Sequence, residues 1–354
     1  MVFLWQCLEK CDKMERVDIK SLSLGQLTEY VKDLGLKSFN AKQIYIWLHQ
    51  KNVASFEEMT NISKQARQQL EAECDIVNLE IAQKQVSVDG TIKYLYRLPD
   101  GNCIESVLMR YEHGNTICVS SQVGCRMGCK FCASTQGGKI RDLTASEILS
   151  QLYATEKDTG DRISNIVLMG IGEPLDNFDN VIRFIEIITS AEGKNISQRN
   201  ISLSTCGIVP KIYELAKLKL GITLSISLHA TTNEARKRTM PVTNAYPLDQ
   251  LMKACRDYTK ATGRRISFEY AMIKGENDTQ EDAVRLSKLL SGFINHVNLI
   301  PVNPVDGSPF SQSDARIIKE FQSRLAQLNV NATIRRRLGQ DISAACGQLR
   351  NEHR

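Results

Sequence analysis

Three closely spaced cysteines form the clearest chemical motif in this sequence. Cys125, Cys129 and Cys132 follow a C-x3-C-x2-C pattern, and Phe131 stands directly before the last of them. In an iron–sulfur cluster each cysteine thiolate binds one iron. Three cysteines would therefore occupy three irons of a 4Fe-4S cluster and leave the fourth iron open to a substrate or cofactor. A structural zinc site needs four ligands, usually as two C-x2-C pairs, and no second pair lies nearby. The spacing therefore favours a cluster over zinc.

The composition is that of an ordinary globular protein with room for one large domain and a smaller one. The chain has 354 residues, of which 42% are hydrophobic and 24% charged, and its net charge is +5. Basic clusters recur in the second half of the chain. A solvated face is the ordinary explanation for each one, but together they favour a polyanionic partner such as nucleic acid. The clusters are Lys139 with Arg141, and residues 236–238, 264–265 and 335–337.

The cysteine count and the apolar runs indicate in which cellular compartment the protein is expected. The eleven cysteines are odd in number and lack the even spacing of a disulfide framework, which favours a reducing cytoplasm. The first apolar run is too short for a signal peptide, and no stretch of 18 apolar residues occurs. We therefore expect a soluble cytoplasmic protein with no membrane association. Residues 1–13 match no pattern, and Met14 is a candidate natural start.

Periodicity divides the chain into regions. After a tail at 1–20, apolar residues follow a helical period three times within 21–78, which predicts a helical accessory domain, a common kind of RNA-binding unit. In 79–115 the period changes to two, and Asp89-Gly90, Pro99-Asp100-Gly101 and His113-Gly114-Asn115 mark turns of a β-hairpin region.

From 116 to 349 strands and helices alternate, before a short tail at 350–354. A capping box begins a helix at Thr144. Such alternation predicts a parallel sheet that is closed, or partly closed, into a barrel, whose functional residues gather at the C-terminal ends of the strands. The later strands are expected at 165–169, 200–204, 222–228, 266–272, 297–301 and 332–334, and the helices between them near 178–191, 210–219, 248–262, 278–290 and 314–327.

A cysteine motif of this kind, opening a barrel, resembles the radical S-adenosylmethionine (SAM) superfamily. Five further strings, all in order, resemble one family within it, the adenine methyltransferases that act on carbon 2 of adenine in 23S ribosomal RNA and in tRNA. They are SSQVGC at 120–125, MGIGEPL at 169–175, LST at 203–205, SLHA at 227–230 and DISAACGQL at 341–349. The resemblance covers about residues 18–349. It implies an α/β fold: a partial (β/α)6 TIM-like barrel with an N-terminal helical domain and a β-hairpin extension.

The resemblance also implies a cofactor site. The cluster on the three cysteines would bind the methionine end of SAM, close to Gly172 and Glu173. Without the resemblance, Glu173 before a proline would be read as a turn, His229 as a structural histidine and Asn303 as a turn cap. The rest of the SAM pocket is implied at Ser204, Ser227, Leu228, His229 and Asn303.

The chemistry follows from the target atom. Carbon 2 of adenine has no nucleophilic lone pair, so methylation there needs a one-electron route, which a cofactor supplies. The resemblance implies that Cys346 takes a methyl group from one SAM, and that a radical made from a second SAM abstracts hydrogen from that methyl. The carbon then adds to adenine, Cys118 releases it by forming a disulfide with Cys346, and Glu105 removes the proton. A buried structural thiol is the ordinary alternative for Cys118, and a solvated carboxylate for Glu105.

The expected partners are 23S rRNA in a protein-poor or unassembled state, tRNA, and an electron donor such as flavodoxin or ferredoxin. The N-terminal helices and scattered basic residues are the expected RNA-binding surface of a monomer. Three alternatives stay open: methylation of carbon 8 of the same ribosomal adenine, a non-catalytic RNA-binding protein with a structural metal, and a radical SAM enzyme for a small molecule or peptide. The string from Gly172 to Leu175 favours carbon 2 over carbon 8, and Cys346 speaks against a small-molecule enzyme.

Overall fold

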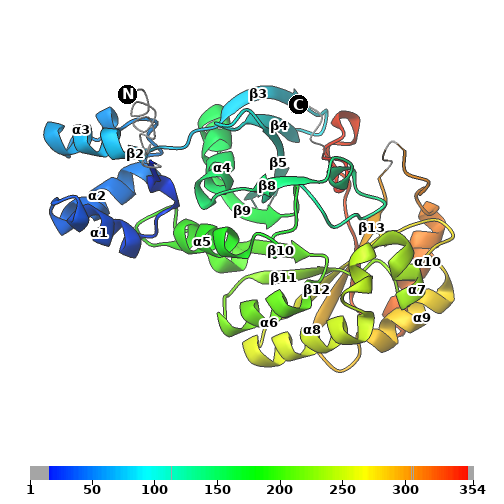
Figure 1. Ribbon diagram of the computed structural model, residues 1–354. Helices are drawn as coiled ribbons and strands as arrows, with labels where there is room; N and C mark the ends of the chain where they lie inside the picture. Colours follow the sequence, from blue (N-terminus) through cyan, green and yellow to red (C-terminus); the bar gives the residue numbers. More distant parts are fainter. Residues whose placement is uncertain (1–15, 113, 304, 306, 350–354) are drawn as a thin grey trace, which may run out of the picture. The chain divides into compact units, whose positions relative to one another are not determined.

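The computed structural model describes residues 16–112, 114–303, 305 and 307–349 (Figure 1). The chain divides into two compact units, Met1–Val77 and Asn78–Arg354, which are described separately below. The candidate start at Met14 lies outside the described residues. No helix in the described part of the chain has both the length and the apolar character needed to cross a bilayer.

The first unit is built from helices, as its periodicity predicts. They are α1 (Leu24–Asp33), α2 (Ser38–His49) and α3 (Lys64–Glu73). Ser23 begins α1, where its hydroxyl accepts a hydrogen bond from the Gln26 N–H and so satisfies an end group of the helix. A short parallel pair, β1 (Val17–Asp18) with β2 (Cys74–Asp75), joins the two ends of the unit. The sequence interpretation had placed residues 17–20 in the tail.

The hairpin region of the second unit contains β3 (Glu80–Val86), β4 (Ile92–Arg97) and β5 (Cys103–Tyr111), which pair in antiparallel fashion. The predicted turns at Asp89-Gly90 and at residues 99–101 connect them and are confirmed. The third predicted turn includes His113, which lies outside the described residues, and Gly114 and Asn115 already belong to the next strand.

These strands extend a sheet that has ten strands among the described residues, in the order β14-β13-β12-β11-β10-β9-β6-β5-β4-β3. From β6 to β14 all neighbours are parallel. The order leaves β14 and β3 at the edges, so the barrel is open, and the predicted partial barrel with a hairpin extension is confirmed. The parallel strands are β6 (Gly114–Cys118), β9 (Ile163–Leu168), β10 (Ile201–Thr205), β11 (Thr223–Ser227), β12 (Ile266–Met272), β13 (Asn295–Pro301) and β14 (Ala332–Ile334).

Helices follow the parallel strands and cover the outside of the sheet (Figure 1). The predicted capping box at Thr144 is confirmed, since its hydroxyl accepts the Glu147 N–H at the start of the first of them. A short helix after β11, α7 (Asn233–Thr239), was not predicted. The longer helices are α4 (Ala145–Thr159), α5 (Phe178–Thr189), α6 (Val209–Lys217), α8 (Leu248–Thr262), α9 (Gln280–Leu289) and α10 (Ala315–Gln327).

The two faces of the parallel strands differ in polarity. Leu203, Ile226 and Phe268 are fully buried and do not line the pocket inside the barrel. Ser204 and Glu269, which alternate with them along the strands, do line it. Because successive side chains of a strand point to opposite faces, the apolar face packs against the helices and the polar face is left for a site.

Candidate active site

The three cysteines of the motif lie in the loop of a small hairpin. Its strands are β7 (Gln122–Gly124) and β8 (Lys139–Asp142), which pair in antiparallel fashion. Gly124 has a φ of 75°, and a Cβ added there would lie 1.9 Å from the carbonyl oxygen of Gly138, so only glycine fits this close crossing. The Cys125 N–H donates to the same carbonyl at 3.0 Å, which closes the loop. The hairpin therefore fixes the two ends of the loop that carries the motif.

All three cysteines line one cavity of about 160 Å³ inside the barrel. Among the described residues, no three His, Cys, Asp or Glu side chains converge on a point that could hold a single metal ion, as a zinc site would require. A cluster makes a different demand, because each thiolate binds a different iron. Burial raises the pKa of the Cys125 thiol to about 12, and iron ionises a thiol that it binds. The donor set and its spread around one cavity therefore fit a 4Fe-4S cluster.

Gly172 and Glu173 follow β9 and line the same cavity. Gly172 has a φ of 108°, and a Cβ there would lie 2.6 Å from that of Gln122, so the turn needs glycine. Glu173 is 4% exposed, and its carboxylate accepts the N–H groups of Leu175 at 3.0 Å and Cys206 at 2.7 Å. Burial raises the pKa of this carboxyl. A carboxylate has about four acceptor positions, so it can still accept donors of a cationic ligand.

The structure brings most of the other predicted SAM residues to this cavity. Ser204, Ser227, His229 and Asn303 line it, each at or beyond the C-terminal end of a parallel strand. Leu228 does not: its side chain is fully buried, and its N–H and carbonyl bind Glu269 and Arg236.

His229 is held in one protonation state by its neighbours. Its Nδ1 accepts the Ala271 N–H at 2.9 Å, and its ring meets that of Phe131 edge-on, with the ring centres 4.9 Å apart. Burial, with a smaller contribution from the Arg236 charge, lowers the pKa of His229 to about 3. The folded protein therefore keeps this imidazole neutral.

This neutral histidine predicts a loss of stability in mild acid. As the pH falls below about 6.5, the unfolded chain takes up a proton that folded His229 refuses until about pH 3, so the free energy of unfolding should decrease across that window. His229→Asn should reduce this decrease, since asparagine tolerates the positive φ of 55° at this position. Urea unfolding of both proteins at about pH 7.5 and 5 measures the difference. His49, whose pKa is also lowered to about 3 by burial, affects both proteins equally. An unchanged pH dependence in the variant would contradict the assignment.

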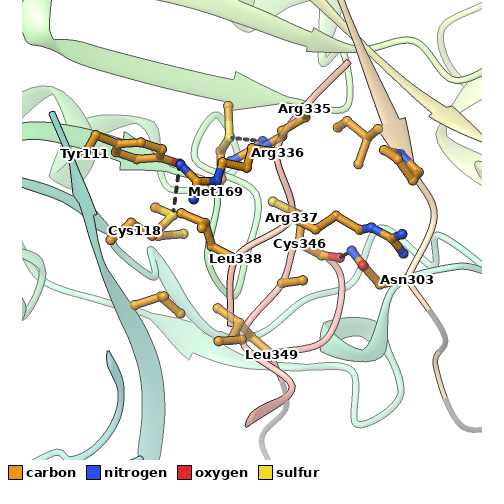
Figure 2. A pocket seen from close by; sticks show the side chains of 16 residues that line it. Tyr111, Cys118, Met169, Asn303, Arg335, Arg336, Arg337, Leu338, Cys346 and Leu349 are labelled. Atoms are coloured by element: carbon orange, nitrogen blue, oxygen red, sulfur yellow. Dashed lines mark hydrogen bonds between the residues drawn. The ribbon is translucent and has the colours of Figure 1, made fainter. Parts of the chain in front are cut away.

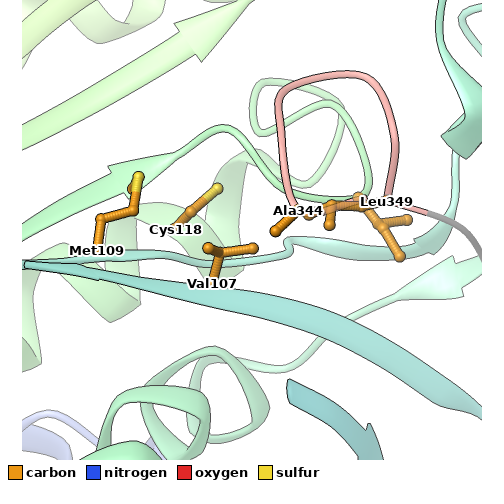
Figure 3. Close-up of a cluster of buried hydrophobic side chains, with 6 residues drawn as sticks. Val107, Met109, Cys118, Ala344 and Leu349 are labelled. Atoms are coloured by element: carbon orange, nitrogen blue, oxygen red, sulfur yellow. The ribbon is translucent and has the colours of Figure 1, made fainter. Parts of the chain in front are cut away.

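A second pocket lies beside the first and contains Cys118 (Figure 2). Cys118 ends β6, is 6% exposed and packs in an apolar cluster with Val107, Met109 and Leu349 (Figure 3). Burial raises its pKa to about 12; the nearby sulfur of Cys346 adds to this shift and the Arg335 charge opposes it. The remaining lining is mostly apolar, with the Tyr111 ring on one side.

Cys346 lines both pockets and stands in the wall between them. Its carbonyl accepts the Asn303 side-chain amide at 3.1 Å, and the next carbonyl, of Gly347, accepts the Ala133 N–H of the cysteine loop at 2.8 Å. Cys118 and Cys346 are both free thiols. The structure therefore brings the two predicted catalytic cysteines to one pocket and links the segment around Cys346 directly to the cysteine loop.

The segment before Cys346 is fastened to the turn between β3 and β4. The Asp341 carboxylate accepts the Ser87 hydroxyl at 2.5 Å and the Val88 N–H at 3.1 Å. The Gly339 N–H donates to the Asp89 carboxylate at 2.8 Å. The hairpin extension thus holds the C-terminal segment in place.

Glu105 lies on β5, on the strand face that also carries Val107 and Met109. It does not itself line the second pocket. Its carboxylate pairs with Lys93 at 3.2 Å, and the Lys93 ammonium is also 3.5 Å from the Ser343 carbonyl of the C-terminal segment. The candidate base is therefore ion-paired and is not among the described residues that line the pocket.

Three charged residues of the site were missed or misread from the sequence. Arg335 and Glu269 line the first cavity, 4.0 Å apart, and Arg335 lines the second pocket as well. Arg236, read as part of a solvated basic cluster, is fully buried, where it donates to the carbonyls of Leu228 and Cys206. Its burial is tolerated because these carbonyls satisfy its N–H groups. The run at 335–337 was the only sequence signal for Arg335.

Comparisons with known proteins agree with this geometry. A model of the radical SAM superfamily matches residues 119–287, and a model of the N-terminal domain of ribosomal RNA large subunit methyltransferases matches residues 17–76. A protein of Lachnospira eligens described as probable dual-specificity RNA methyltransferase RlmN is 54% identical, over 95% of this chain and 96% of the relative. A protein of Lachnoclostridium phytofermentans with the same description is 52% identical, over 96% of each chain. The crystal structure of a radical SAM methyltransferase from Sphaerobacter thermophilus is 39% identical, with a TM-score of 0.91 over 95% of this chain and all of that one. The chain therefore belongs to the RlmN family of radical SAM RNA methyltransferases.

Proposed function

We propose that this enzyme methylates carbon 2 of one adenine in the peptidyl-transferase region of 23S rRNA and of one anticodon-adjacent adenine in tRNA, with Cys346 as the carrier of the methyl carbon. The observation that carries the proposal is the position of Cys346 in the wall shared by the two pockets. A thiol placed there can receive a methyl group from one side and present it to a base on the other.

The first pocket has the lining that the methyl donor needs. The cofactors of the superfamily are SAM and a 4Fe-4S cluster, which together would supply the one-electron chemistry that an unreactive carbon requires. Cys125, Cys129 and Cys132 would hold the cluster. Glu173 would accept hydrogen bonds from the ammonium group of SAM, and the polar residues at the strand ends would hold the rest of the cofactor. One SAM would methylate Cys346 and a second would activate that methyl, so two are used per turnover.

The second pocket has the lining that a flipped base needs. Enzymes that act on a base take it out of the stack and hold it against aromatic and apolar side chains, and Tyr111, Leu338 and Leu349 offer such a surface. With the carbon bonded to both Cys346 and the adenine, the Cys118 thiolate would attack the sulfur of Cys346. A disulfide forms, and the electron pair of the broken sulfur–carbon bond passes to the carbon, which takes up a proton and becomes the methyl group. Before that step, Glu105 would remove the proton from carbon 2 of the adenine, and the adduct would lose one electron, for which the oxidised cluster is the available acceptor, so that the adenine ring is restored.

The partners follow from this chemistry. The substrates would be tRNA and 23S rRNA that is protein-poor or unassembled. The N-terminal helical unit would contribute to the binding of both RNAs. An electron donor such as flavodoxin or ferredoxin would reduce the cluster. We expect the enzyme to act as a monomer in the cytoplasm.

The position of the methyl group tests the proposal directly. Reconstituted enzyme, incubated anaerobically with SAM, a reductant and either an rRNA fragment or tRNA, should yield 2-methyladenosine in the digested RNA, as seen by mass spectrometry. The same experiment separates the alternative, because methylation of carbon 8 would give 8-methyladenosine. Formation of 8-methyladenosine alone, or no methylated base in either RNA, would contradict the proposal.

A further inference from the structure

Three consecutive arginines line the pocket that contains both catalytic cysteines, and they differ in burial. Arg335, Arg336 and Arg337 follow β14 and all line the pocket, where the Arg336 side chain extends toward Tyr111 and that of Arg337 toward Asn303 (Figure 2). The Arg335 side chain is only 23% exposed, with Glu269 4.0 Å away and the Met169 sulfur 3.5 Å away. Arg336 and Arg337 are exposed. The run therefore has one inner member and two at the rim.

Within the part of the chain that the structure describes, the two rim arginines have no counter-charge. Neither Arg336 nor Arg337 forms an ion pair with a residue that the structure describes, and the polar contact of Arg337 is with the neutral Gln312 amide at 2.5 Å. Other arginines of the same unit are paired with carboxylates: Arg110 with Asp161, Arg141 with Glu147 and Arg285 with Asp282. Two uncompensated guanidinium groups at a pocket mouth favour an anionic ligand there.

The interior of the pocket indicates which anion this is. Its apolar and aromatic lining suits a flat base, and a base inside the pocket leaves its ribose and phosphates at the mouth. A guanidinium presents paired donors that match phosphate oxygens. Contacts to phosphate position a nucleic acid without reading its sequence, which suits an enzyme that accepts an adenine from two different RNAs.

We propose that Arg336 and Arg337 bind the backbone phosphates that flank the target adenine, whereas Arg335, paired with Glu269, binds none. The proposal rests on the function proposed above, because it takes RNA as the occupant of the second pocket. Arg336 and Arg337 would therefore contribute to the affinity for RNA, whereas Arg335 would only form part of the pocket lining beside the cysteines.

Salt-dependent RNA binding by the reconstituted protein tests this assignment without any methyl transfer. Fluorescence anisotropy with labelled tRNA, between about 50 and 200 mM salt, gives the affinity and its salt slope. Arg336→Gln and Arg337→Gln should each weaken binding roughly tenfold at about 0.1 M salt and lower the slope by about 1. Arg335→Gln should leave the slope unchanged. Arg316→Gln is the matched control: its side chain on α10 is 84% exposed, lies outside the second pocket, and the substitution removes the same charge.

The outcomes separate this proposal from the proposed function. Wild-type affinity and slope in the Arg336→Gln and Arg337→Gln variants would overturn the phosphate assignment, and so would an equal change in Arg335→Gln or Arg316→Gln. These results would leave methylation by the wild-type enzyme untouched. Conversely, a wild-type protein that makes no methylated adenine overturns the proposed function, whatever the slopes are.

Discussion

Cys346→Ala should reduce methyl transfer to RNA to background, even though SAM and RNA can still bind. The physical reason is that, among the described residues that line both pockets, Cys346 is the single thiol. Under the proposed function, no other thiol could take the methyl group from the first pocket and present it in the second. SAM with a labelled methyl group, incubated with enzyme and RNA, measures the result as label in the recovered RNA. Mass spectrometry of the protein should show a methylated Cys346 peptide in the wild type before RNA is added.

Cys255→Ala is a suitable control for the loss of Cys346. Cys255 is a buried thiol on α8 that lines neither pocket, so its removal should leave methyl transfer in place. Labelled methyl that reached RNA in the Cys346→Ala protein would show that the carbon travels by another route.

Cys118→Ala should convert the enzyme into one that traps its substrate. With Cys346 intact, the carbon can still bond to the adenine, but no other described cysteine lines the second pocket to attack the Cys346 sulfur from the side of the base. A covalent protein–RNA adduct should therefore accumulate to about one per active enzyme. A denaturing gel would show this adduct as a slowly migrating band that ribonuclease removes. The double variant Cys118→Ala, Cys346→Ala should form none, because it lacks the attachment point.

This result also distinguishes catalysis from packing at Cys118. The thiol is part of a buried apolar cluster, so its loss costs some stability under either interpretation. Only the loss of a resolving thiol leaves a covalent adduct behind; the loss of a thiol that merely packs does not. Free, fully methylated RNA from the Cys118→Ala enzyme would refute the resolving role.

Much of the barrel could be predicted because its signals are local. The strand β12 was expected at the residues where it lies, since its apolar run is bounded by turn residues, and Thr144 carries its helix start in its own four-residue pattern. The small hairpin of β7 and β8 was missed because its strands have three and four residues and pair across a loop. The helix α7 was missed because its buried residues, Arg236 and Thr239, are polar and give no apolar period. Arg236 is satisfied by carbonyls from other parts of the chain.

The site, too, has a part that the sequence could predict and a part that it could not. Residue types and spacing indicated the three cluster cysteines, and resemblance added the strand-end residues that line the first cavity. Neither could indicate that Asn303 holds the carbonyl of Cys346, or that Glu269 faces Arg335, since these pairs join residues 43 and 66 positions apart. Such contacts depend on how the strands pair, and a single strand's sequence carries no record of its neighbour.

The attachment of the C-terminal segment to the turn between β3 and β4 links two stretches of sequence that share no local pattern. Asp89 must both shape its own turn, where it accepts the Thr91 N–H at 2.9 Å, and bind Gly339. A lengthened or rebuilt turn could keep a good hairpin and still displace the Cys346 thiol. Exchange of this turn between related enzymes should therefore succeed only when the residues around Asp341 are exchanged with it, so that the two segments behave as one inherited unit.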